Sequence, residues 1–303
     1  MSNFNDQFIY AIIIIFIGYV LKRSRVIQEK DGEGLSRIIF NLTLPALIIS
    51  SLSDMKIEYS LFLLVIIAFA YGLGMGALSI LIFNREPPKI KGMLTMLVSG
   101  LNIGLFAYPL VEGIWGKDGV KYFGMFDIGN SLIVFGLLYL VANYYSFEKT
   151  ELSVKDIFKK LIKSIPLMTY LTVCLFIVIN LPIPEIVLDV TDVISSANTP
   201  LSFLLLGVYL HFSYEKGYYK RIFIVILVRY GIGTVIGLSL FYLFPFDDLF
   251  NYTMLIGFIL PASLTVLPYS IEFNYDQKLV GTTINITILL SFLLLWGIAN
   301  IFF

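Results

Sequence analysis

Apolar stretches alternate with short polar segments along almost the whole chain. Each stretch is close to the roughly 20 residues that an α-helix needs to cross a bilayer, and the polar segments are too short for a separate soluble domain. The pattern therefore predicts one membrane unit with ten spanning helices. Their approximate bounds are 8–22, 35–53, 61–83, 92–113, 119–145, 164–181, 186–210, 220–244, 251–272 and 277–302.

The composition supports the lipid bilayer as the solvent of the chain. Of 303 residues, 58% are hydrophobic and 14% are charged, whereas soluble domains are roughly half apolar and about a quarter charged. The formal net charge is zero and no basic run alternates with aromatic residues, so we expect no nucleic-acid partner. The single cysteine, Cys174, lies in an apolar run and cannot form an intrachain disulfide.

Basic residues gather in alternate loops. The segments after the first, third, fifth and seventh predicted spans are rich in lysine and arginine, whereas the opposite loops hold only Lys56, Lys117 and Lys121. Basic loops lie on the cytoplasmic side of membrane proteins. We therefore predict a multi-pass protein of the cell membrane with both termini outside, which agrees with an even number of spans. The loop before the tenth span, with Lys278 alone, gives this prediction its weakest support.

The two halves of the chain share a weak internal repeat. Tyr71-Gly72-Leu73-Gly74 recurs as Tyr230-Gly231-Ile232-Gly233, and Pro109 coincides with Pro268 at the same offset. A chance alignment of glycine and proline in apolar sequence is the alternative explanation. Two further pairs coincide after a shift of four residues, namely Pro45 with Pro200 and Asn130 with Asn285.

Five spans per copy is an odd number, so the second copy must enter the membrane in the opposite orientation. We therefore predict an all-α membrane protein built from two inverted five-helix repeats. The first repeat covers residues 1–145, a cytoplasmic linker covers 146–163, and the second repeat covers 164–303.

Spans four and nine are each interrupted in the middle. The fourth reads Asn102-Ile103-Gly104-Leu105-Phe106-Ala107-Tyr108-Pro109, and the ninth reads Pro261-Ala262-Ser263-Leu264-Thr265-Val266-Leu267-Pro268. Proline lacks a backbone donor and clashes with the preceding turn, so we expect both helices to break or kink here. The freed backbone groups cannot face lipid, so they must line a cavity or find partners in neighbouring helices.

Paired interruptions in corresponding positions of two halves point to the binding site of a transporter, although proline kinks also occur for packing alone. Broken helices would aim the positive ends of half-helices at the middle of the membrane, which favours an anion such as a carboxylate. We therefore predict a substrate site at the two interruptions. Its residues are Asn102, Ile103, Gly104, Tyr108, Pro109, Pro261, Ala262 and Ser263, together with Asn130 and Asn285 as donors or helix caps.

Two ionisable residues lie deep in predicted spans, Asp127 in span five and Arg229 in span eight. Such groups are costly in a membrane and usually face a cavity or a partner. Asp127 could bind a coupling proton or Na⁺, or it could form an ion pair with Arg229, for which Asp192 is a competing partner. Arg229 could instead contact the substrate, and Asn130 and Asn285 could simply join helices.

The sequence argues against an enzyme. It has no His-Glu-x-x-His run, no Gly-x-Ser-x-Gly elbow and no phosphate-binding loop. The glycine pairs Gly72 with Gly76 and Gly233 with Gly237 are expected to bring helices close together. The only histidine, His211, has too few potential ligands near it for a metal site, so we expect no metal and no cofactor beyond a coupling ion.

Five short motifs follow one another along the chain: Asn41-Leu42-Thr43-Leu44-Pro45-Ala46, the Asn102 to Pro109 segment, Asp127-Ile128-Gly129-Asn130, Ala197-Asn198-Thr199-Pro200-Leu201 and Leu260-Pro261-Ala262. In this order they resemble the auxin efflux carrier family over nearly the whole chain. The resemblance implies a scaffold of spans one, two, six and seven, often a homodimer. It also implies a moving domain of spans three to five and eight to ten, in which the broken spans four and nine cross.

Members of this family move small organic anions, including auxin in plants and dicarboxylates such as malate and malonate in prokaryotes. The resemblance implies that the segment from Asn102 to Pro109 touches the substrate carboxylate. The segment between spans five and six is short here, which favours a compact prokaryotic type over a hormone carrier. We therefore predict a secondary transporter of a small organic anion that works by alternating access. A ligand sensor on a transporter fold and a passive channel are the alternatives.

Overall fold

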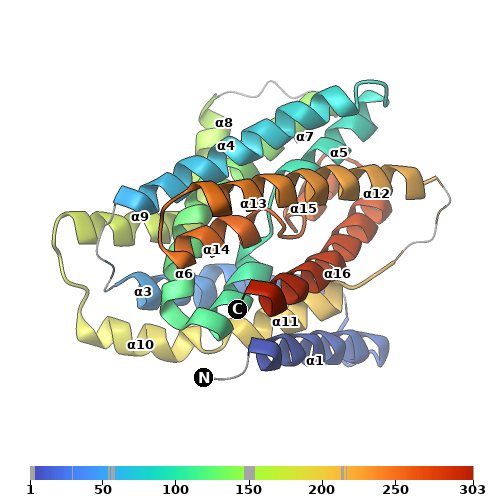
Figure 1. The fold of residues 1–303 in the computed structure, drawn as a ribbon. Helices are drawn as coiled ribbons and strands as arrows, with labels where there is room; N and C mark the ends of the chain where they lie inside the picture. Colours follow the sequence, from blue (N-terminus) through green and yellow to red (C-terminus); the bar gives the residue numbers. More distant parts are fainter. Residues whose placement is uncertain are drawn as a thin grey trace.

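The computed structural model describes residues 4–28, 30–53, 55, 59–146, 154–212, 215 and 217–302. Within these residues the chain is helical, with connecting loops and no strand (Figure 1). The predicted all-α class is therefore confirmed for the described part of the chain. Lys56 and residues 147–153 of the predicted linker lie outside it.

The first half of the chain contains three π-helical turns, Ile39–Thr43 between α2 and α3, Ile103–Ala107 before α6, and Ile133–Leu137 between α6 and α7. Such wider turns often occur at functional sites. The α-helices of this half are α1 (Phe4–Arg23), α2 (Asp31–Ile38), α3 (Leu44–Leu52), α4 (Tyr59–Ile82), α5 (Pro88–Ser99), α6 (Tyr108–Leu132) and α7 (Leu138–Tyr145).

The second half contains one π-helical turn, Leu227–Gly231, which joins α12 to α13 in a continuous helix. Its α-helices are α8 (Val154–Lys163), α9 (Ile165–Val178), α10 (Glu185–Ser195), α11 (Asn198–Tyr209), α12 (Tyr219–Ile226), α13 (Ile232–Leu243), α14 (Asp248–Gly257), α15 (Val266–Glu272) and α16 (Gln277–Phe302).

Six helical stretches in the described residues are long and apolar enough to cross a bilayer, and the pair α8 and α9, bent by 78°, would make a seventh. The predicted spans 186–210 and 251–272 are not among them because each is divided, into α10 and α11 and into α14 and α15. The structure therefore supports a multi-pass membrane protein. The ten-span inverted repeat stays a prediction.

The longest helical stretch, Ile103–Tyr145, covers parts of two predicted spans. It kinks at Gly116, whose φ of +62° and ψ of −145° are open to glycine and costly for any residue with a Cβ. The loop expected between spans four and five is therefore a glycine kink inside α6.

Some helices begin before the residue that hydropathy predicts, because their first turns are polar but well capped. α5 begins at Pro88, and proline in a first turn removes no helical hydrogen bond. α14 begins at Asp248, and the Oδ1 of Asp247 accepts from the Phe250 N–H at 3.0 Å. A hydropathy pattern identifies the apolar length of a helix and does not detect polar first turns of this kind.

Polar contacts join several of the predicted cytoplasmic loops to one another. Arg221 pairs with Glu86 at 2.9 Å, and Lys278 pairs with Glu215 at 3.3 Å. These pairs connect the loops after α4, α11 and α15, so the three loops share one end of the molecule. Figure 1 shows the loops after α4 and α11 at the right, and those after α9 and α13 at the left.

The two termini lie together. The Nε1 of Trp296 donates to the Oδ1 of Asn5 at 2.9 Å, so the beginning of α1 is beside the end of α16. Figure 1 shows the two marked ends near each other. Both termini therefore lie at the same end of the molecule, as an even number of spans requires; the side of the membrane that they face stays a prediction.

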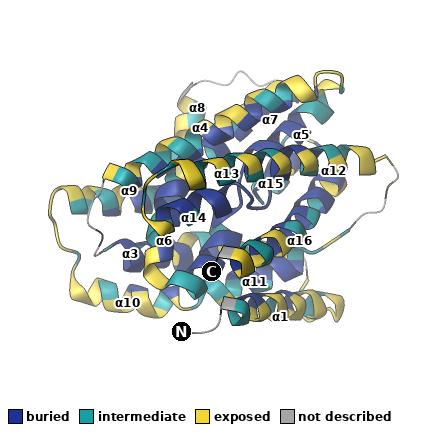
Figure 2. Cartoon of the chain, in the orientation of Figure 1, coloured by how far each residue is buried: buried dark blue, intermediate teal, exposed yellow. Residues whose placement is uncertain are grey.

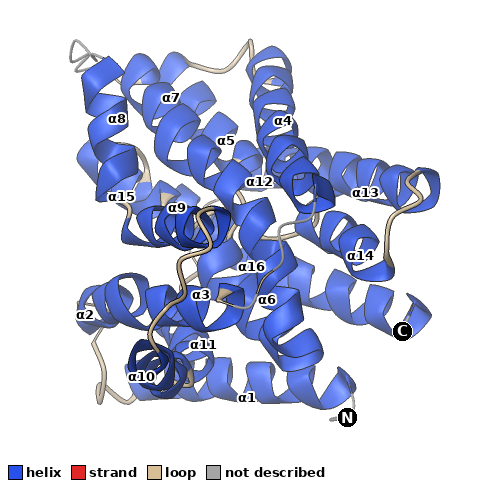
Figure 3. Cartoon of the chain, turned by 90° about the vertical axis from the view of Figure 1, so that its left-hand side faces the viewer, coloured by secondary structure: helices blue, strands red, loops and turns tan. Residues whose placement is uncertain are grey.

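The helices form two neighbouring groups. α1 packs on α11, α10 on α3, and α3 on α9, whereas α4 packs on α5 and α6, and α13 packs on α14. Figure 3 shows α1, α2, α10 and α11 on one side of the molecule and α4, α5, α7, α12 and α13 on the other. The backbones of α1 and α11 approach closely, because a Cβ on Gly18 would lie 2.3 Å from the Leu204 carbonyl oxygen.

The outer faces of the helices are apolar and exposed. Phe16 on α1, Val193 on α10 and Tyr242 on α13 are more than 60% exposed, and Figure 2 shows exposed residues along these outer helices and buried ones around α3, α6 and α14. Large exposed apolar faces mark contact with a membrane or a partner. Inside, a Cβ on Gly72 would lie 2.5 Å from Ile133, and one on Gly233 would lie 2.3 Å from a backbone oxygen, which confirms the packing role predicted for these glycines.

Candidate functional site

The chain leaves the helical path at the end of α5 and again at the end of α14, and the two irregular segments meet. Leu101 and Ala262 form an antiparallel bridge. Beside the bridge, the Asn102 N–H donates to the Pro261 carbonyl at 2.9 Å. The interruptions predicted for spans four and nine are therefore confirmed, and they contact each other backbone to backbone. We call these two segments, residues 100–102 and 258–265, the crossing.

Different sequence features open the two helices. α5 ends because Gly100 is extended, and its carbonyl accepts from the Ser263 N–H at 3.2 Å. Pro261 lies inside the second break, where its missing N–H costs no helical hydrogen bond. Pro268 lies in the first turn of α15, which proline tolerates, whereas Pro109 follows the π-helical turn Ile103–Ala107 inside the helix that leaves the crossing. Span four therefore breaks before its proline, which corrects the expectation that Pro109 breaks it.

Asn102 caps the half-helix that leads from the crossing into α6. Its Oδ1 accepts from the Leu105 N–H at 3.4 Å, and the residue is 5% exposed. Its Nδ2 is buried and has no hydrogen-bond partner in the structure. In the second half, the Oγ of Ser263 accepts from the Thr265 N–H at 3.3 Å. The first half-helix therefore begins at the crossing with a capped end that carries partial positive charge, whereas the Ser263 contact forms a turn just before α15 and does not cap it.

Gly104 places the first half-helix against the π-helical turn between α2 and α3. A Cβ on Gly104 would lie 3.1 Å from Phe40 and 3.4 Å from Leu44. In the same turn, the Thr43 hydroxyl donates to the Asn198 Oδ1 at 3.0 Å, and both residues are buried. The crossing therefore lies next to two of the motifs that indicated the family.

Asn130 holds the first segment of the crossing in place. Its Oδ1 accepts from the Leu101 N–H at 3.1 Å, and its Nδ2 donates to the Leu101 carbonyl at 3.2 Å. The same Nδ2 donates to Asp127 Oδ1 at 3.1 Å, and the Tyr108 hydroxyl donates to Asp127 Oδ2 at 3.1 Å. Asp127 is 7% exposed. One buried carboxylate is therefore connected to both the crossing and the half-helix after it.

Hydroxyl groups hold the second segment of the crossing, and the sequence did not indicate them. The Thr287 Oγ1 accepts from the Ala262 N–H at 3.1 Å. The Tyr230 hydroxyl donates to the Thr287 carbonyl at 2.6 Å and lies 2.8 Å from the Ser291 Oγ. Tyr230 opens the repeated Tyr-Gly motif, and this was the one signal that could have drawn attention to the group.

Asn285 does not take the place that the repeat predicted for it. Its Nδ2 donates to the carbonyls of Tyr209 and His211, at 3.1 and 2.7 Å, at the end of α11. The residue that matches Asn130 in contacting the bridge is Thr287, two residues further along the chain. The alignment was wrong here because only a single asparagine fixed the offset in this part of the repeat.

Arg229 is fully buried, at 0% exposed, in the π-helical turn between α12 and α13. Its guanidinium donates to the carbonyls of Leu97 and Val98, at 3.1 and 2.8 Å. It also donates to the carbonyls of Leu260, at 3.0 and 2.8 Å, and Pro261, at 2.7 Å.

Arg229 therefore does not form the ion pair with Asp127 or Asp192 that was one of the alternatives. Asp192 instead pairs with Lys117 at 2.9 Å, and the two oxygens of Asp127 accept from neutral groups. Carbonyls at helix ends satisfy the guanidinium, and a search of the sequence for opposite charges cannot find them. The five N–H groups of the guanidinium all donate to backbone carbonyls, and the Tyr230 side chain also interacts with Arg229. These contacts do not assign Arg229 a direct contact with substrate.

Eight of the predicted site residues come together in the crossing and the half-helix turns beside it, and Asn130 contacts the crossing from α6. The eight are Asn102, Ile103, Gly104, Tyr108, Pro109, Pro261, Ala262 and Ser263. In the described residues, no group of three or more His, Cys, Asp and Glu residues is placed to hold a metal ion.

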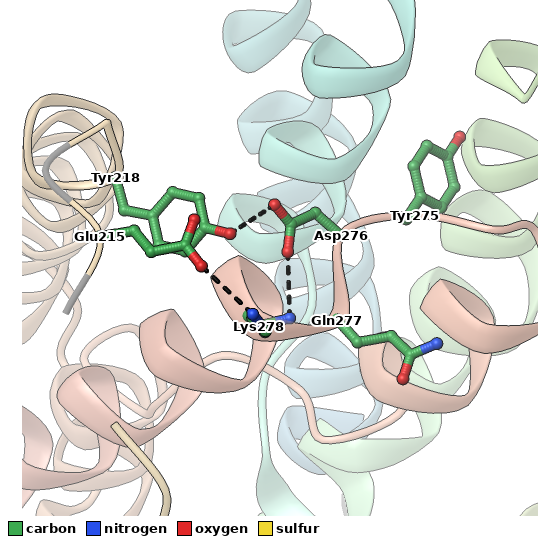
Figure 4. Close-up of a pocket in the computed structure, with 6 residues that line it drawn as sticks. All are labelled: Glu215, Tyr218, Tyr275, Asp276, Gln277 and Lys278. Carbon is green, nitrogen blue, oxygen red and sulfur yellow. Dashed lines mark hydrogen bonds and ion pairs between the residues drawn. The ribbon is translucent and has the colours of Figure 1, made fainter. Parts of the chain in front are cut away.

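A separate hollow of about 480 Å³ lies at the end of the molecule where the basic loops meet, and Figure 4 shows the six residues that line it. Its polar groups bind one another: the Tyr218 hydroxyl donates to Asp276 at 2.6 Å, and Lys278 pairs with Glu215. Burial, followed by the hydrogen bonds to these carboxylates, raises the pKa of Tyr218, which therefore remains a donor. None of the predicted site residues lines this hollow, and we assign no substrate to it.

Comparison with known proteins bears on what the crossing is for. A family model described as "Membrane transport protein" matches residues 6–298. An uncharacterized transporter of Methanothermobacter thermautotrophicus is 26% identical over 296 residues, which cover 95% of each chain. An uncharacterized transporter of Methanocaldococcus jannaschii is 25% identical over 306 residues, which cover 96% of this chain and 97% of the relative.

These proteins are transporters and not enzymes, and the matched region contains the crossing, Asp127 and Arg229. The family match extends across both halves of the chain. The chain therefore belongs to the membrane transport protein family, the family of the auxin efflux carriers.

Proposed function

We propose that this protein is a secondary transporter that moves a small organic anion across the membrane by alternating access. The substrate class is a carboxylate such as malate, malonate or an auxin-like acid. The observation that carries the proposal is the buried Asn102 Nδ2, a donor without a partner, at the place where two half-helices begin. A buried donor without a partner is costly, and a bound carboxylate would satisfy it.

The charge at the crossing favours an anion. The half-helices that begin after Asn102 and Ser263 direct the positive ends of their dipoles toward the crossing. Discontinuous helices bind anionic groups of transported substrates in this way. No carboxylate other than Asp127 contacts the crossing through the hydrogen bonds described above, so little negative charge opposes a bound anion.

The moving parts in this proposal follow the two groups of helices. The scaffold would comprise α1 to α3 and α8 to α11, and the moving domain would comprise α4 to α7 and α12 to α16, as two inverted five-helix repeats require. Polar contacts join the groups near one end: Glu112 accepts from the Thr199 hydroxyl at 2.6 Å, Lys117 pairs with Asp192 at 2.9 Å, and Trp296 on α16 donates to Asn5 on α1 at 2.9 Å. Alternating access requires these contacts to break when that end opens.

Asp127 is the proposed site for a coupling proton. Both oxygens of Asp127 accept hydrogen bonds from neutral donors, Tyr108 and Asn130. In this arrangement neither donor presents an oxygen atom as a further ligand for a cation bound to the carboxylate. Na⁺ prefers a cage of several oxygen ligands, so a proton fits this site better than Na⁺. Protonation would remove an acceptor from Asn130, which also holds Leu101, and would thus connect the charge state of Asp127 to the crossing.

The test is counterflow uptake of radiolabelled malate, malonate and indole-3-acetate into proteoliposomes. Asn102→Ala should lower saturable uptake at least tenfold, whereas Asn84→Ala, an exposed loop asparagine, should leave it unchanged. Asp127→Asn should abolish the response to a proton gradient, with the exposed Asp248→Asn as its control. Native-like uptake by Asn102→Ala would contradict the proposed site.

The rival functions give different results in the same vesicles. A sensor would bind one of these anions without carrying it, and a passive channel would pass it without saturation or counterflow. Either result would replace the transporter proposal. Binding of the anion to the purified protein, measured by calorimetry, separates a sensor from a protein that prefers another solute.

We also propose that the protein is a homodimer in the cell membrane with both termini outside. The face of α10 that carries Ile186, Val190 and Val193 is at least 50% exposed at each of these residues and offers an apolar surface to lipid or to a second scaffold. In a Cys174→Ser background, Asn300→Cys should react with an impermeant maleimide on intact cells, whereas Lys89→Cys should not. The opposite labelling would invert the topology, and a monomeric mass in detergent would contradict the dimer.

A further inference from the structure

We propose that the Arg229 guanidinium is a built-in cation of the crossing, which fills a carbonyl-lined cation site formed by the ends of α5 and α14. This site would otherwise bind a free monovalent cation. The functional part of the inference rests on the proposed transport role, whereas the existence of the site does not.

All donors of the guanidinium are used. An arginine side chain has five N–H bonds, and Arg229 makes five hydrogen bonds, two through Nη1, two through Nη2 and one through Nε. All of the acceptors are backbone carbonyl oxygens. The side chain therefore has the contacts of a cation in an oxygen cage and not those of a partner in an ion pair.

The carbonyls come from the end of one helix and from the irregular segment that follows another. Leu97 and Val98 belong to the last turn of α5, and Leu260 and Pro261 lie in the break that follows α14. The last carbonyls of a helix have no partner within it and carry the negative end of its dipole. The end of α5 and the Leu260 and Pro261 carbonyls of the break together surround one charge, which explains how a buried guanidinium persists without a carboxylate beside it.

Carriers with inverted repeats hold coupling ions in sites of this kind. Unwound carbonyls and the C-terminal ends of broken helices coordinate Na⁺ in carriers with inverted repeats. Here a side chain from the helix α12–α13 occupies the corresponding kind of site permanently. We infer that this position requires no Na⁺ during transport, because its charge cannot dissociate.

Arg229 also fixes the backbone that Asn102 uses. The Pro261 carbonyl accepts from Arg229 Nη2 at 2.7 Å and from the Asn102 N–H at 2.9 Å. A single oxygen therefore lies between the guanidinium and the residue proposed to bind the anion. Arg229 acts as a positioning residue that joins α5, α14 and the crossing, and it adds positive charge beside the substrate position.

The experiment is chemical rescue of the purified protein in detergent, followed by thermal unfolding. Arg229→Ala should lower the unfolding midpoint by roughly 10 °C, because it leaves several buried carbonyls without donors. Ethylguanidinium at millimolar concentration replaces the atoms that this substitution removes, and it should restore at least half of the loss. Na⁺ and K⁺ at the same ionic strength serve as the comparison ions, and rescue by either would equally reveal a vacated cation site.

Two further variants serve as controls for this experiment. Arg221→Ala removes the arginine of the partly exposed pair with Glu86 and should show no rescue by ethylguanidinium. Arg229→Lys keeps one charge with fewer donors, and it should fold with an intermediate midpoint if Arg229→Ala cannot be purified. An Arg229→Met protein as stable as the native one, or an Arg229→Ala protein that no cation stabilises, would overturn the proposal.

The transport consequence is tested separately. If the native protein carries an anion, replacement of Na⁺ by K⁺ on both sides should leave uptake unchanged, and a strict Na⁺ requirement would contradict Na⁺ independence of this site. If no anion is carried at all, the stability experiment still decides whether the cation site exists. Failure of the proposed function and failure of the cation site are thus distinguishable.

Discussion

The two halves of the crossing meet in one bridge but differ in chemistry. In the first half, Leu101 is held by a carboxamide that also contacts a carboxylate, through Asn130 and Asp127. In the second half, Ala262 is held by the hydroxyl of Thr287, next to Tyr230. One half therefore contains a group that can gain a proton, whereas the other contains only neutral hydroxyls beside a permanent cation.

This difference teaches that two segments joined in one bridge need not be held by the same kinds of side chain. The geometry of the bridge requires only that each strand find partners for its backbone groups, and an amide or a hydroxyl can supply them. The remaining chemistry is then free to differ between the halves. Titration in the first half and fixed charge in the second would give the transporter one adjustable charge and one constant charge.

The largest effect is expected for Asn130→Ala. It leaves the N–H and the carbonyl of Leu101 without their partner inside the protein, and each unsatisfied buried group costs about 1–3 kcal/mol. We expect a loss of about 3 kcal/mol in unfolding free energy and no measurable anion uptake. Thermal unfolding in detergent measures the first and proteoliposome uptake the second. A variant as stable as the native protein would show that Asn130 is not needed to hold the strand.

A smaller loss is expected for the corresponding change in the second half, Thr287→Val. This nearly isosteric substitution removes the acceptor for the Ala262 N–H and the hydroxyl that donates to the Ile284 carbonyl in the same helix, so we expect a loss of about 1–2 kcal/mol. The same unfolding measurement compares it directly with Asn130→Ala. A larger loss for Thr287→Val than for Asn130→Ala would contradict the expectation that two hydrogen bonds to Leu101 hold the first segment more strongly than one hydrogen bond to Ala262 holds the second.

The turns that follow the two half-helices provide a third comparison. Gly116 has φ of +62° with a ψ that few other residues adopt, and Asn274 has φ of +54°. Gly116→Ala should cost about 1–2 kcal/mol, and Asn274→Ala about 1 kcal/mol, because asparagine tolerates the left-handed region better than alanine does. Asn274→Gly is the control and should be close to neutral; equal losses at all three would point to side-chain contacts and not to backbone strain.

The smallest stability effect is expected for Tyr108→Phe. It removes one hydrogen bond to Asp127, so we expect a loss of about 1 kcal/mol or less. Its effect on coupling should be larger than its effect on stability, because Asp127 loses one of the two donors that stabilise its charged form. Uptake measured across a series of external pH values should therefore respond at higher pH than in the native protein. An unchanged pH profile would separate Tyr108 from the coupling site.

The sequence predicted the crossing because interruptions in a membrane helix are visible as composition. Prolines, asparagine and serine in the middle of apolar stretches marked both breaks, and Asn130 was identified from its motif. Pro109 was wrongly taken as the cause of a break, because the chain leaves the helical path at Gly100 and has resumed a helix at Ile103, before it reaches the proline. Hydropathy does not show on which side of a proline the helix breaks.

The partners of the buried groups could not be predicted in the same way. Arg229 was matched with carboxylates because charge is the only partner that a sequence displays, whereas its true partners are backbone carbonyls. Thr287 was missed because threonine is common in membrane helices and has no distinguishing pattern. Asn285 was chosen instead because an asparagine is conspicuous, although its amide contacts the end of α11.

The contact between the two ends of the chain has an optical consequence. The protein has two tryptophans; Trp115 stacks with Tyr252 at 6.0 Å, whereas Trp296 donates to Asn5 at 2.9 Å. Trp296 belongs to α16 and Asn5 to α1, which the proposed mechanism assigns to different domains. In a Trp115→Phe protein, the emission of the remaining indole would therefore report relative motion of the domains without an attached dye.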